Sequence, residues 1–289
     1  MRYRTLGRTG LRVSEVGIGG APIGIPNYVE AWDPHAPSSA SQVADLVAHA
    51  ESLGYNYIDT APGYGSGRGE EIVGRALRGR RSGWVLATKC GWRGAAADVV
   101  RSAEESLRRL ETDCVDVLQL HGGDFTAADA EHIVHGGPLE GLTRLRDSGK
   151  ARFLGVTAEE PVTLRPLIAT GAFDIVQIRF NVLHQGAYDN ILPEAARAGL
   201  GIVVMRSATS GLLPKLLRAA SAEGAAAFEA RCSLAELAIN FVLSAPQVSV
   251  ALVGMRRREE ADANARLSDD AARRWDQGWL HDRFVHPGG

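Results

Sequence analysis

The chain has 289 residues, of which 45% are hydrophobic and 23% charged, so it is long enough to bury a large core and too evenly mixed to be disordered. Its 32 Lys and Arg nearly balance its 34 Asp and Glu, which gives a formal net charge of -2. No bulk electrostatic field therefore favours nucleic acid or an anionic membrane surface as a partner.

The cysteines and the N-terminal segment indicate the compartment. Cys90, Cys114 and Cys232 are widely spaced and form no CxxC pair, which predicts free thiols in a reducing environment and no structural zinc site. The first ten residues, MRYRTLGRTG, lack the apolar stretch of a signal peptide, and no run of about 18 apolar residues occurs. We expect a cytoplasmic protein.

The first elements in the chain predict a small β-hairpin. Arg2 to Leu6 and Leu11 to Ser14 flank Gly7-Arg8-Thr9-Gly10, which has the composition of a turn. Eight short apolar runs then alternate with longer amphipathic stretches, as in a parallel sheet covered by helices. The predicted strands are Glu15 to Gly19, Tyr55 to Asp59, Trp84 to Lys89, Val115 to His121, Arg152 to Val156, Ile175 to Ile178, Ile202 to Met205 and Val248 to Val253.

Helices are predicted between these strands. Ser41 to Leu53 places apolar residues at helical spacing and is followed by Gly54, a helix stop signal. The other helices are expected to begin near Glu70, Ala97, Gly137, Pro161, Asp189, Ser233 and Arg257. Eight strand and helix units over this length favour an α/β fold, a (β/α)8 TIM barrel with an N-terminal β-hairpin, over a doubly wound sheet. No linker divides the chain, so residues 1–289 are expected to form a single domain.

Four polar residues lie at or just after the ends of the predicted strands. They are Asp59, Tyr64, Lys89 and His121. A single buried Asp or Lys would more often belong to a structural ion pair, and a single histidine would more often be a core residue. In a barrel, however, the carboxyl ends of the strands carry the chemistry, so the four together indicate an active site.

The segments around these residues resemble those of the aldo-keto reductase family. The resemblance is carried, in order and at the family's spacing, by IDTAPGYGSGRGEEIVGRAL, VLATKCG, DVLQLHGGD and GKARFLGVT. It implies an NADP(H)-dependent oxidoreductase that reduces an aldehyde or ketone, with Asp59, Tyr64, Lys89 and His121 as its catalytic tetrad. Two other functions stay open on the same barrel: a nicotinamide-assisted lyase or epimerase without net redox change, and a cofactor-binding regulatory subunit.

The chemistry of these side chains is consistent with such roles. Carbonyl reduction needs a proton donor near neutral pH, and a tyrosine with a pKa of about 10 is a weak one. A neighbouring Lys89 ammonium is expected to lower the pKa of Tyr64, with Asp59 orienting that ammonium. Tyr64 is then the general acid. His121 either donates a hydrogen bond to the substrate carbonyl or shares in the proton transfer.

The cofactor has no Rossmann site here, because GIGGAPIG after the first strand lacks the context of a dinucleotide-binding motif. The resemblance implies that the nicotinamide carboxamide is held by a Gln and by a Ser-Asn pair. This chain has Gln177 at the first position, and Thr157 and Ala158 at the pair. Ala158 has no side-chain hydrogen bond to offer, and Asn181 is a candidate replacement. Met205 stands where the family stacks an aromatic residue on the nicotinamide ring. Further cofactor contacts are expected from Gly20, Ala21, Asp59, Arg206, Ser207, Ala208, Gly211, Gly254, Arg256, Glu260 and Asn264.

The segment after the eighth strand bears on the choice of dinucleotide. Three arginines beginning at Arg256 suit a 2′-phosphate at a helix start, unless they form an ordinary solvated helix face. Glu260 stands where the family often has Gln or Arg, and its charge would repel that phosphate. NADP(H) is favoured, with NAD(H) as the alternative.

The substrate is expected to be a small carbonyl or hydroxyl compound, and the oligomeric state is open. Tyr64 and His121 would contact it. Trp32, in a long loop from Gly24 to Ser39, and Trp92 either line the substrate pocket or only pack. Near the C-terminus, Trp275, Trp279 and Phe284 either fold a tail over the barrel mouth or only pack the last helix.

Overall fold

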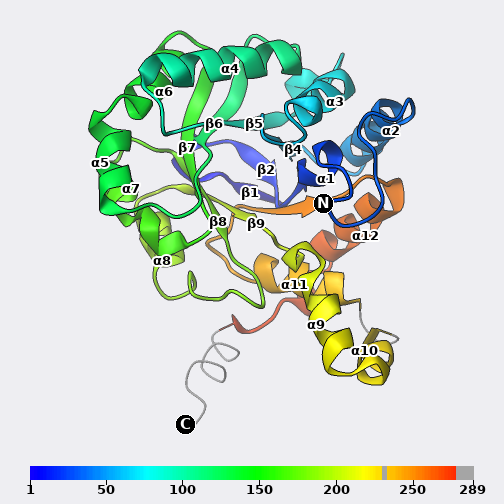
Figure 1. Ribbon diagram of the computed structural model, residues 1–289. Helices are drawn as coiled ribbons and strands as arrows, with labels where there is room; N and C mark the ends of the chain where they lie inside the picture. The colour runs from blue at the N-terminus through cyan, green and yellow to red at the C-terminus, as the bar shows by residue number, and fades with distance from the viewer. Residues whose placement is uncertain (230–232, 278–289) are drawn as a thin grey trace.

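The structure is a computed structural model that describes residues 1–229 and 233–277. Its centre is a closed barrel of eight parallel strands that follow one another in chain order, and the last strand pairs with the first (Figure 1). The barrel strands are β3 (Val16–Gly19), β4 (Tyr57–Asp59), β5 (Val85–Cys90), β6 (Val115–Leu120), β7 (Ala151–Ala158), β8 (Ile175–Arg179), β9 (Gly201–Met205) and β10 (Val250–Gly254). The predicted (β/α)8 barrel is confirmed.

The strands form where the sequence is continuously apolar, because both faces of each strand are covered. Every residue of β5 and β6 is buried, including polar residues such as Lys89 that point into the barrel. Most predicted strand boundaries shift by one or two residues, and two of these shifts bear on the site. β4 begins at Tyr57 rather than Tyr55, and β6 ends at Leu120. His121 therefore lies just beyond its strand, at the open end of the barrel.

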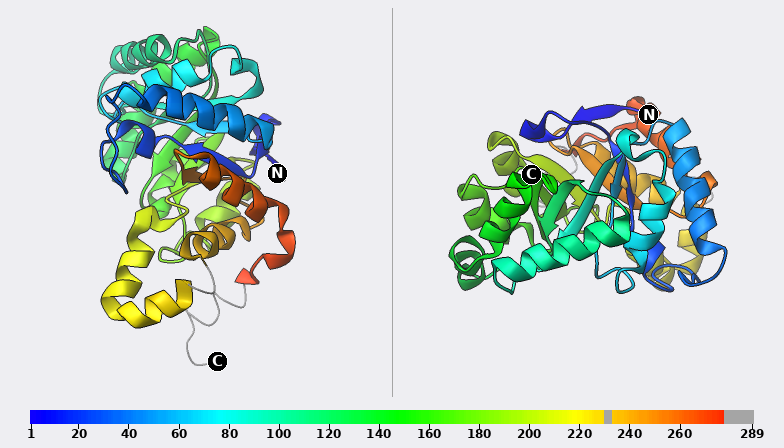
Figure 2. Two further views of the ribbon diagram at one scale, coloured as in Figure 1. Left: turned by 90° about the vertical axis from the view of Figure 1, so that its right-hand side faces the viewer. Right: turned by 90° about the horizontal axis from the view of Figure 1, so that it is seen from above.

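The helices surround the barrel (Figures 1 and 2). They are α1 (Ala21–Gly24), α2 (Ser39–Ser52), α3 (Arg68–Ala76), α4 (Ala96–Leu110), α5 (Ala127–His135), α6 (Pro138–Asp147), α7 (Arg165–Ala169), α8 (Ile191–Arg197), α9 (Leu212–Ala220), α10 (Ala222–Glu229), α11 (Leu234–Leu243) and α12 (Arg258–Asp269). Short 3-10 helices occur at Gly7–Thr9, Arg81–Gly83, Pro161–Leu164, Thr209–Gly211 and Ala271–Arg273.

Most predicted helices occur within a few residues of their expected starts, and four were not predicted. These are α1, α5, α9 and α10. α1 is a single turn, whereas α9 buries none of its residues and projects with α10 beyond the barrel (Figure 2). The sequence of α9, LLPKLLRAA, is amphipathic at helical spacing, so the prediction passed over a signal that was present.

The N-terminal hairpin closes one end of the barrel. β1 (Tyr3–Thr5) pairs antiparallel with β2 (Arg12–Ser14), and both lie across the barrel in Figure 1. Leu6 and Val13 are fully buried against residues at the beginnings of the barrel strands, including Val85. The end that remains open is therefore the one formed by the carboxyl ends of the strands, where barrel active sites lie. Within the described residues, no helix is long and apolar enough to cross a membrane.

Candidate active site

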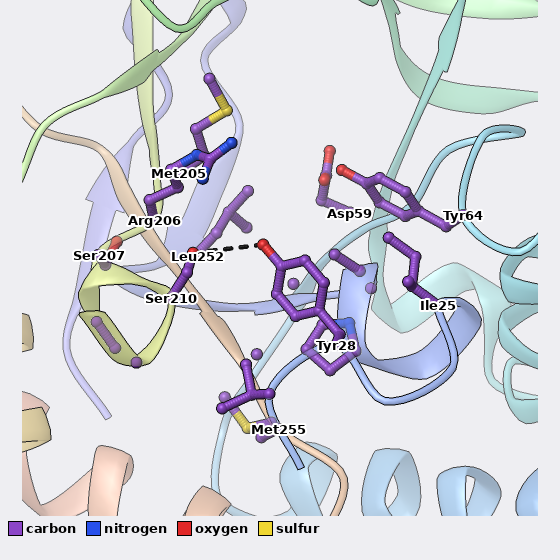
Figure 3. A pocket seen from close by; sticks show the side chains of 18 of the residues that line it. Ile25, Tyr28, Asp59, Tyr64, Met205, Arg206, Ser207, Ser210, Leu252 and Met255 are labelled. Atoms are coloured by element: carbon purple, nitrogen blue, oxygen red, sulfur yellow. Dashed lines mark hydrogen bonds between the residues drawn. The ribbon is translucent and has the colours of Figure 1, made fainter. Parts of the chain in front are cut away.

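A cavity of about 550 Å³ opens at the carboxyl ends of the strands (Figure 3). Most of the residues predicted from the sequence to form the site line it. They are Gly20, Ala21, Asp59, Tyr64, His121, Thr157, Gln177, Met205, Arg206, Ser207, Ala208, Gly211, Gly254, Arg256 and Glu260. Its volume is within the range of small-molecule and cofactor sites.

Asp59, Lys89 and Tyr64 form one hydrogen-bonded group. Asp59 is the last residue of β4 and Lys89 lies on the neighbouring β5, so strand pairing brings the two together. Lys89 Nζ donates to Asp59 Oδ1 at 2.6 Å and lies 3.3 Å from the Tyr64 hydroxyl. Its third partner is the Thr60 carbonyl oxygen at 2.8 Å. Lys89 is 1% exposed and lies behind the cavity wall, with Asp59 and Tyr64 between it and the open space.

The loop that carries Tyr64 is fixed by close backbone packing. The Tyr64 carbonyl oxygen accepts a hydrogen bond from Gly69 N at 3.0 Å, at the start of α3. A Cβ atom at Gly24, the last residue of α1, would lie 2.4 Å from the same oxygen. Only glycine fits there, so the contact of α1 with this loop sets the place of the Tyr64 ring.

The ionisation of Tyr64 differs from the expectation drawn from the sequence. Burial raises the pKa of Tyr64, and the Lys89 ammonium lowers it only in part, so the pKa stays above the usual value. The expected net fall was wrong because the sequence does not reveal how deeply the phenol is buried. The phenol is therefore protonated at neutral pH and holds a proton that it can donate.

Burial and pairing act in opposite directions on both members of the ion pair between Lys89 and Asp59. Burial lowers the pKa of Lys89, but the Asp59 charge and Tyr64 outweigh it and leave the pKa above the usual value. For Asp59, burial raises the pKa against the opposing effect of Lys89. Because each charge compensates the other in a dry environment, neither group can lose its partner without a large energetic cost.

His121 completes the group from the other side of Tyr64. The two rings stack edge to face with centroids 6.0 Å apart and an interplanar angle of 88°. Desolvation and the nearby Lys89 charge lower the pKa of His121 to about 4. The imidazole is neutral at pH 7, so it carries one N–H donor and is not an imidazolium that could act as an acid.

Gln119 is a buried partner of this group that the sequence analysis missed. Its Nε2 donates to Asp59 Oδ2 at 3.2 Å and to Gln177 Oε1 at 2.9 Å. It therefore links the catalytic group to a predicted cofactor residue. Its position two residues before His121, one period of an extended strand, is the signal that could have identified it.

The predicted carboxamide contacts are only partly available. Thr157 lines the cavity, but its Oγ1 accepts from Gly122 N at 3.0 Å and donates to Gly122 O at 3.2 Å. Asn181 is not among the lining residues, because its side chain donates to Arg206 O at 3.1 Å and accepts from the backbone of His184. The Asn181 amide is therefore already engaged, and its replacement of the missing amide contact stays a prediction. Gln177 lines the cavity as predicted.

Charged groups mark the far end of the cavity, at the start of α12. The Arg256 side chain is 9% exposed, and its guanidinium lies 4.9 Å from the Trp32 ring centroid. The buried Nη1 atom of Arg256 has no hydrogen-bond partner. Glu260 Oε2 accepts from the backbone N–H of Arg256 at 2.7 Å and of Arg257 at 3.0 Å. Asn264 is buried in α12 and does not line the cavity, contrary to prediction.

Comparison with known proteins identifies the family. The aldo/keto reductase family model matches residues 15–277. This chain belongs to the aldo/keto reductase family. It is 29% identical over 291 residues to an L-galactose dehydrogenase of Arabidopsis thaliana, which covers 91% of this chain and 87% of the relative.

Solved aldo/keto reductases share the fold. An aldo-keto reductase of Bacillus halodurans in its holo form superposes with a TM-score of 0.75 at 26% identity, over 94% of this chain and 91% of that one. One from Klebsiella pneumoniae, in complex with NADP and acetate, gives a TM-score of 0.78 at 23% identity, over 99% and 96% of the two chains.

Several loop residues of this aldo/keto reductase were not foreseen as part of the site. Arg206 was expected to face a pyrophosphate, but its guanidinium binds the Glu159 carboxylate, with Nε 2.8 Å from Oε1. The Tyr28 side chain points toward Ser210 in Figure 3, and its hydroxyl lies 3.3 Å from Ser210 Oγ. Glu159, Tyr28 and Ser210 all line the cavity.

Trp32, Trp92 and Trp275 of this aldo/keto reductase are not among the residues that line the cavity. Trp92 is 7% exposed and packs on Phe125 with ring centroids 5.3 Å apart. Trp32 packs against Arg256, and the Trp275 backbone N–H donates to Ser244 Oγ at the end of α11. The packing alternative therefore describes Trp32 and Trp92, whereas Trp275 is 36% exposed. Trp279, Phe284 and Cys232 lie outside the described residues.

Proposed function

We propose that this chain is an NADP(H)-dependent oxidoreductase that reversibly reduces an aldehyde or ketone to an alcohol. The observation that carries the proposal is the Tyr64 hydroxyl, which faces the cavity 3.3 Å from an ammonium that is itself paired with Asp59. A protonated phenol beside a fixed positive charge can give its proton and be stabilised as phenolate.

The chain's residues divide the work of the reaction among them. In reduction, Tyr64 donates its proton to the carbonyl oxygen while Lys89 stabilises the charge left on the phenolate. In the oxidative direction, the same phenolate takes the proton from the alcohol. His121, neutral at pH 7, donates a hydrogen bond to the carbonyl oxygen and orients it. Of the two roles open for His121 from the sequence, the lowered pKa supports the positioning role.

The residues present fit a nicotinamide dinucleotide. When bound, this cofactor supplies the hydride in reduction and accepts it in oxidation. Gln177 and Thr157 would hold the nicotinamide end, and the Met205 thioether would pack on the ring. At the other end, the unpartnered, buried Nη1 of Arg256 is an unused donor suited to a phosphate oxygen. The complex of the Klebsiella relative with NADP also supports NADP(H).

The substrate, on this proposal, is a small carbonyl or hydroxyl compound, and the protein acts in the cytoplasm. Cys90 and Cys114 are free thiols, which is consistent with a reducing compartment. The cavity offers polar side chains as well as apolar ones at its substrate side, including Glu159 and Tyr28. The likeness to an L-galactose dehydrogenase makes sugars the first compounds to test.

A carbonyl panel tests the proposal with the purified full chain. NADPH absorbance is followed with aldehydes, ketones and, in the reverse direction, sugars with NADP⁺. Carbonyl-dependent oxidation of NADPH in stoichiometric yield supports the proposal. Product formation without net cofactor consumption would instead establish the lyase or epimerase alternative. Tight NADPH binding without turnover of any compound would establish the regulatory alternative.

A further inference from the structure

The end of the cavity near α12 contains balanced charges. Arg256 and Arg257 supply two positive charges, and the carboxylates of Glu30 and Glu260 supply two negative ones. Arg257 Nη1 lies 2.7 Å from Glu30 Oε2, and Arg256 Nη2 lies 3.4 Å from the same oxygen. The guanidinium groups that could hold a phosphate are thus already paired with a carboxylate of the protein.

The helix start is paired as well. Glu260 occupies the third helical position of α12 and accepts the backbone N–H groups of Arg256 and Arg257. Glu260 thereby takes up the two backbone donors just before α12 that could otherwise bind an anion. Among the groups that could hold an anion here, the arginine side chains are the ones that Glu30 contacts.

Glu30 comes from a short loop that can yield without disturbing the barrel. Its base is closed by two hydrogen bonds: Asn27 N donates to Trp32 O at 3.1 Å, and Trp32 N donates to Asn27 Oδ1 at 3.0 Å. The Glu30 side chain is 52% exposed, whereas the Arg256 side chain beneath it is 9% exposed. The carboxylate can move into water, while the guanidinium stays in place on Trp32.

We propose that the Glu30 carboxylate is a built-in competitor for the phosphate group that distinguishes NADP(H) from NAD(H), and so sets how strongly this protein prefers the phosphorylated cofactor. The inference rests on the proposed function. Binding of a 2′-phosphate replaces Glu30 at Arg256 and Arg257, whereas a ribose 2′-hydroxyl leaves the Glu30 contacts intact. Glu30 thus narrows the difference in affinity between the two dinucleotides.

Removing the carboxylate should strengthen binding of the phosphorylated ligand alone. Because the Glu30 and Arg257 side chains are each 52% exposed, their pairing is of surface strength, worth less than about 1 kcal/mol. We therefore expect Glu30→Gln to tighten NADPH binding by about fivefold and to change NADH binding by less than about twofold.

The test measures dissociation constants by titration calorimetry on the full chain, with no turnover involved. The ligands are NADPH and NADH, together with the fragments adenosine 2′,5′-bisphosphate and ADP. The matched control is Glu111→Gln, which removes the same charge from a glutamate paired with Arg78, outside the cavity lining. The control should leave all four dissociation constants unchanged.

The outcomes separate this inference from the proposed function. A selective gain for NADPH and adenosine 2′,5′-bisphosphate in Glu30→Gln alone supports it. The inference would be overturned if Glu30→Gln changed the dissociation constants of NADPH and NADH equally, or those of the two fragments equally. No change, or weaker binding of the phosphorylated ligands, would overturn it too. Failure of both dinucleotides to bind the unmodified protein would refute the proposed function. In that case the dissociation constants of adenosine 2′,5′-bisphosphate and ADP would still test the role of Glu30.

Discussion

Replacing Lys89 by Met tests whether the pair behind Tyr64 is charged. Lys89 and Asp59 are 1% and 2% exposed, and their closest atoms are 2.6 Å apart. The substitution leaves the Asp59 carboxylate with the amides of Gln119 and Gln177 as side-chain partners, and Gln119 Nε2 lies 3.2 Å from Oδ2. Breaking a buried pair on one side costs about 3–5 kcal/mol, so we expect Lys89→Met to lower the free energy of unfolding by that amount near neutral pH.

The variant offers its own internal check, because Asp59 can escape the penalty by taking a proton. Without Lys89, the folded-state pKa of Asp59 rises further above its unfolded value of about 3.9. The unfolded chain then releases this proton at lower pH than the folded chain. The penalty should consequently be small near pH 4 and grow as the pH rises through the raised folded-state pKa.

Urea unfolding at pH 5 and pH 8 measures both effects, with Asp59→Asn/Lys89→Met as the matched control. The double variant removes both charges, so it should be more stable at pH 8 than Lys89→Met alone. A Lys89→Met protein within about 0.5 kcal/mol of the unmodified chain at pH 8 would refute the reasoning. So would a penalty that does not depend on pH.

Two further predictions follow from other buried groups. The rate of carbonyl reduction should be flat between about pH 5.5 and pH 9, because the pKa of His121 is lowered to about 4 and the pKa of Tyr64 is raised. A pH–rate profile with a break near pH 6.5 would show instead that His121 titrates normally and acts as a proton donor. Arg109→Met should lower the free energy of unfolding, measured by urea denaturation, by about 3 kcal/mol, because the fully buried Glu70 loses its ion-pair partner at 2.6 Å. A loss below about 1 kcal/mol would contradict a buried ion pair between Arg109 and Glu70.

The parts of the molecule that follow a local pattern were predictable. Apolar strands repeated along the chain gave the barrel, and the rule that barrel chemistry lies at strand ends brought Asp59, Tyr64, Lys89 and His121 together. The structure places the first three within hydrogen-bonding distance and His121 against the Tyr64 ring. That residues 1–289 form a single domain stays a prediction.

The parts that depend on contacts between loops were not predictable. Arg206 meets Glu159, and Arg257 meets Glu30, across segments far apart in the sequence and without periodicity. The net pKa shift of Tyr64 was missed for a related reason. Its sign depends on the balance between burial and a single charge, and only the folded structure shows how deep the phenol lies.

The central claim is that the Tyr64 phenol supplies the proton to the substrate oxygen. The most direct measurement is the single-turnover rate of NADPH oxidation by Tyr64→Phe, which keeps the ring that packs on His121 and removes only the hydroxyl. The rate should fall by about 10²- to 10⁴-fold, while the dissociation constant for NADPH stays within about twofold of that of the unmodified chain. A Tyr64→Phe protein that reduces the same carbonyl within about threefold of the original rate would contradict the account.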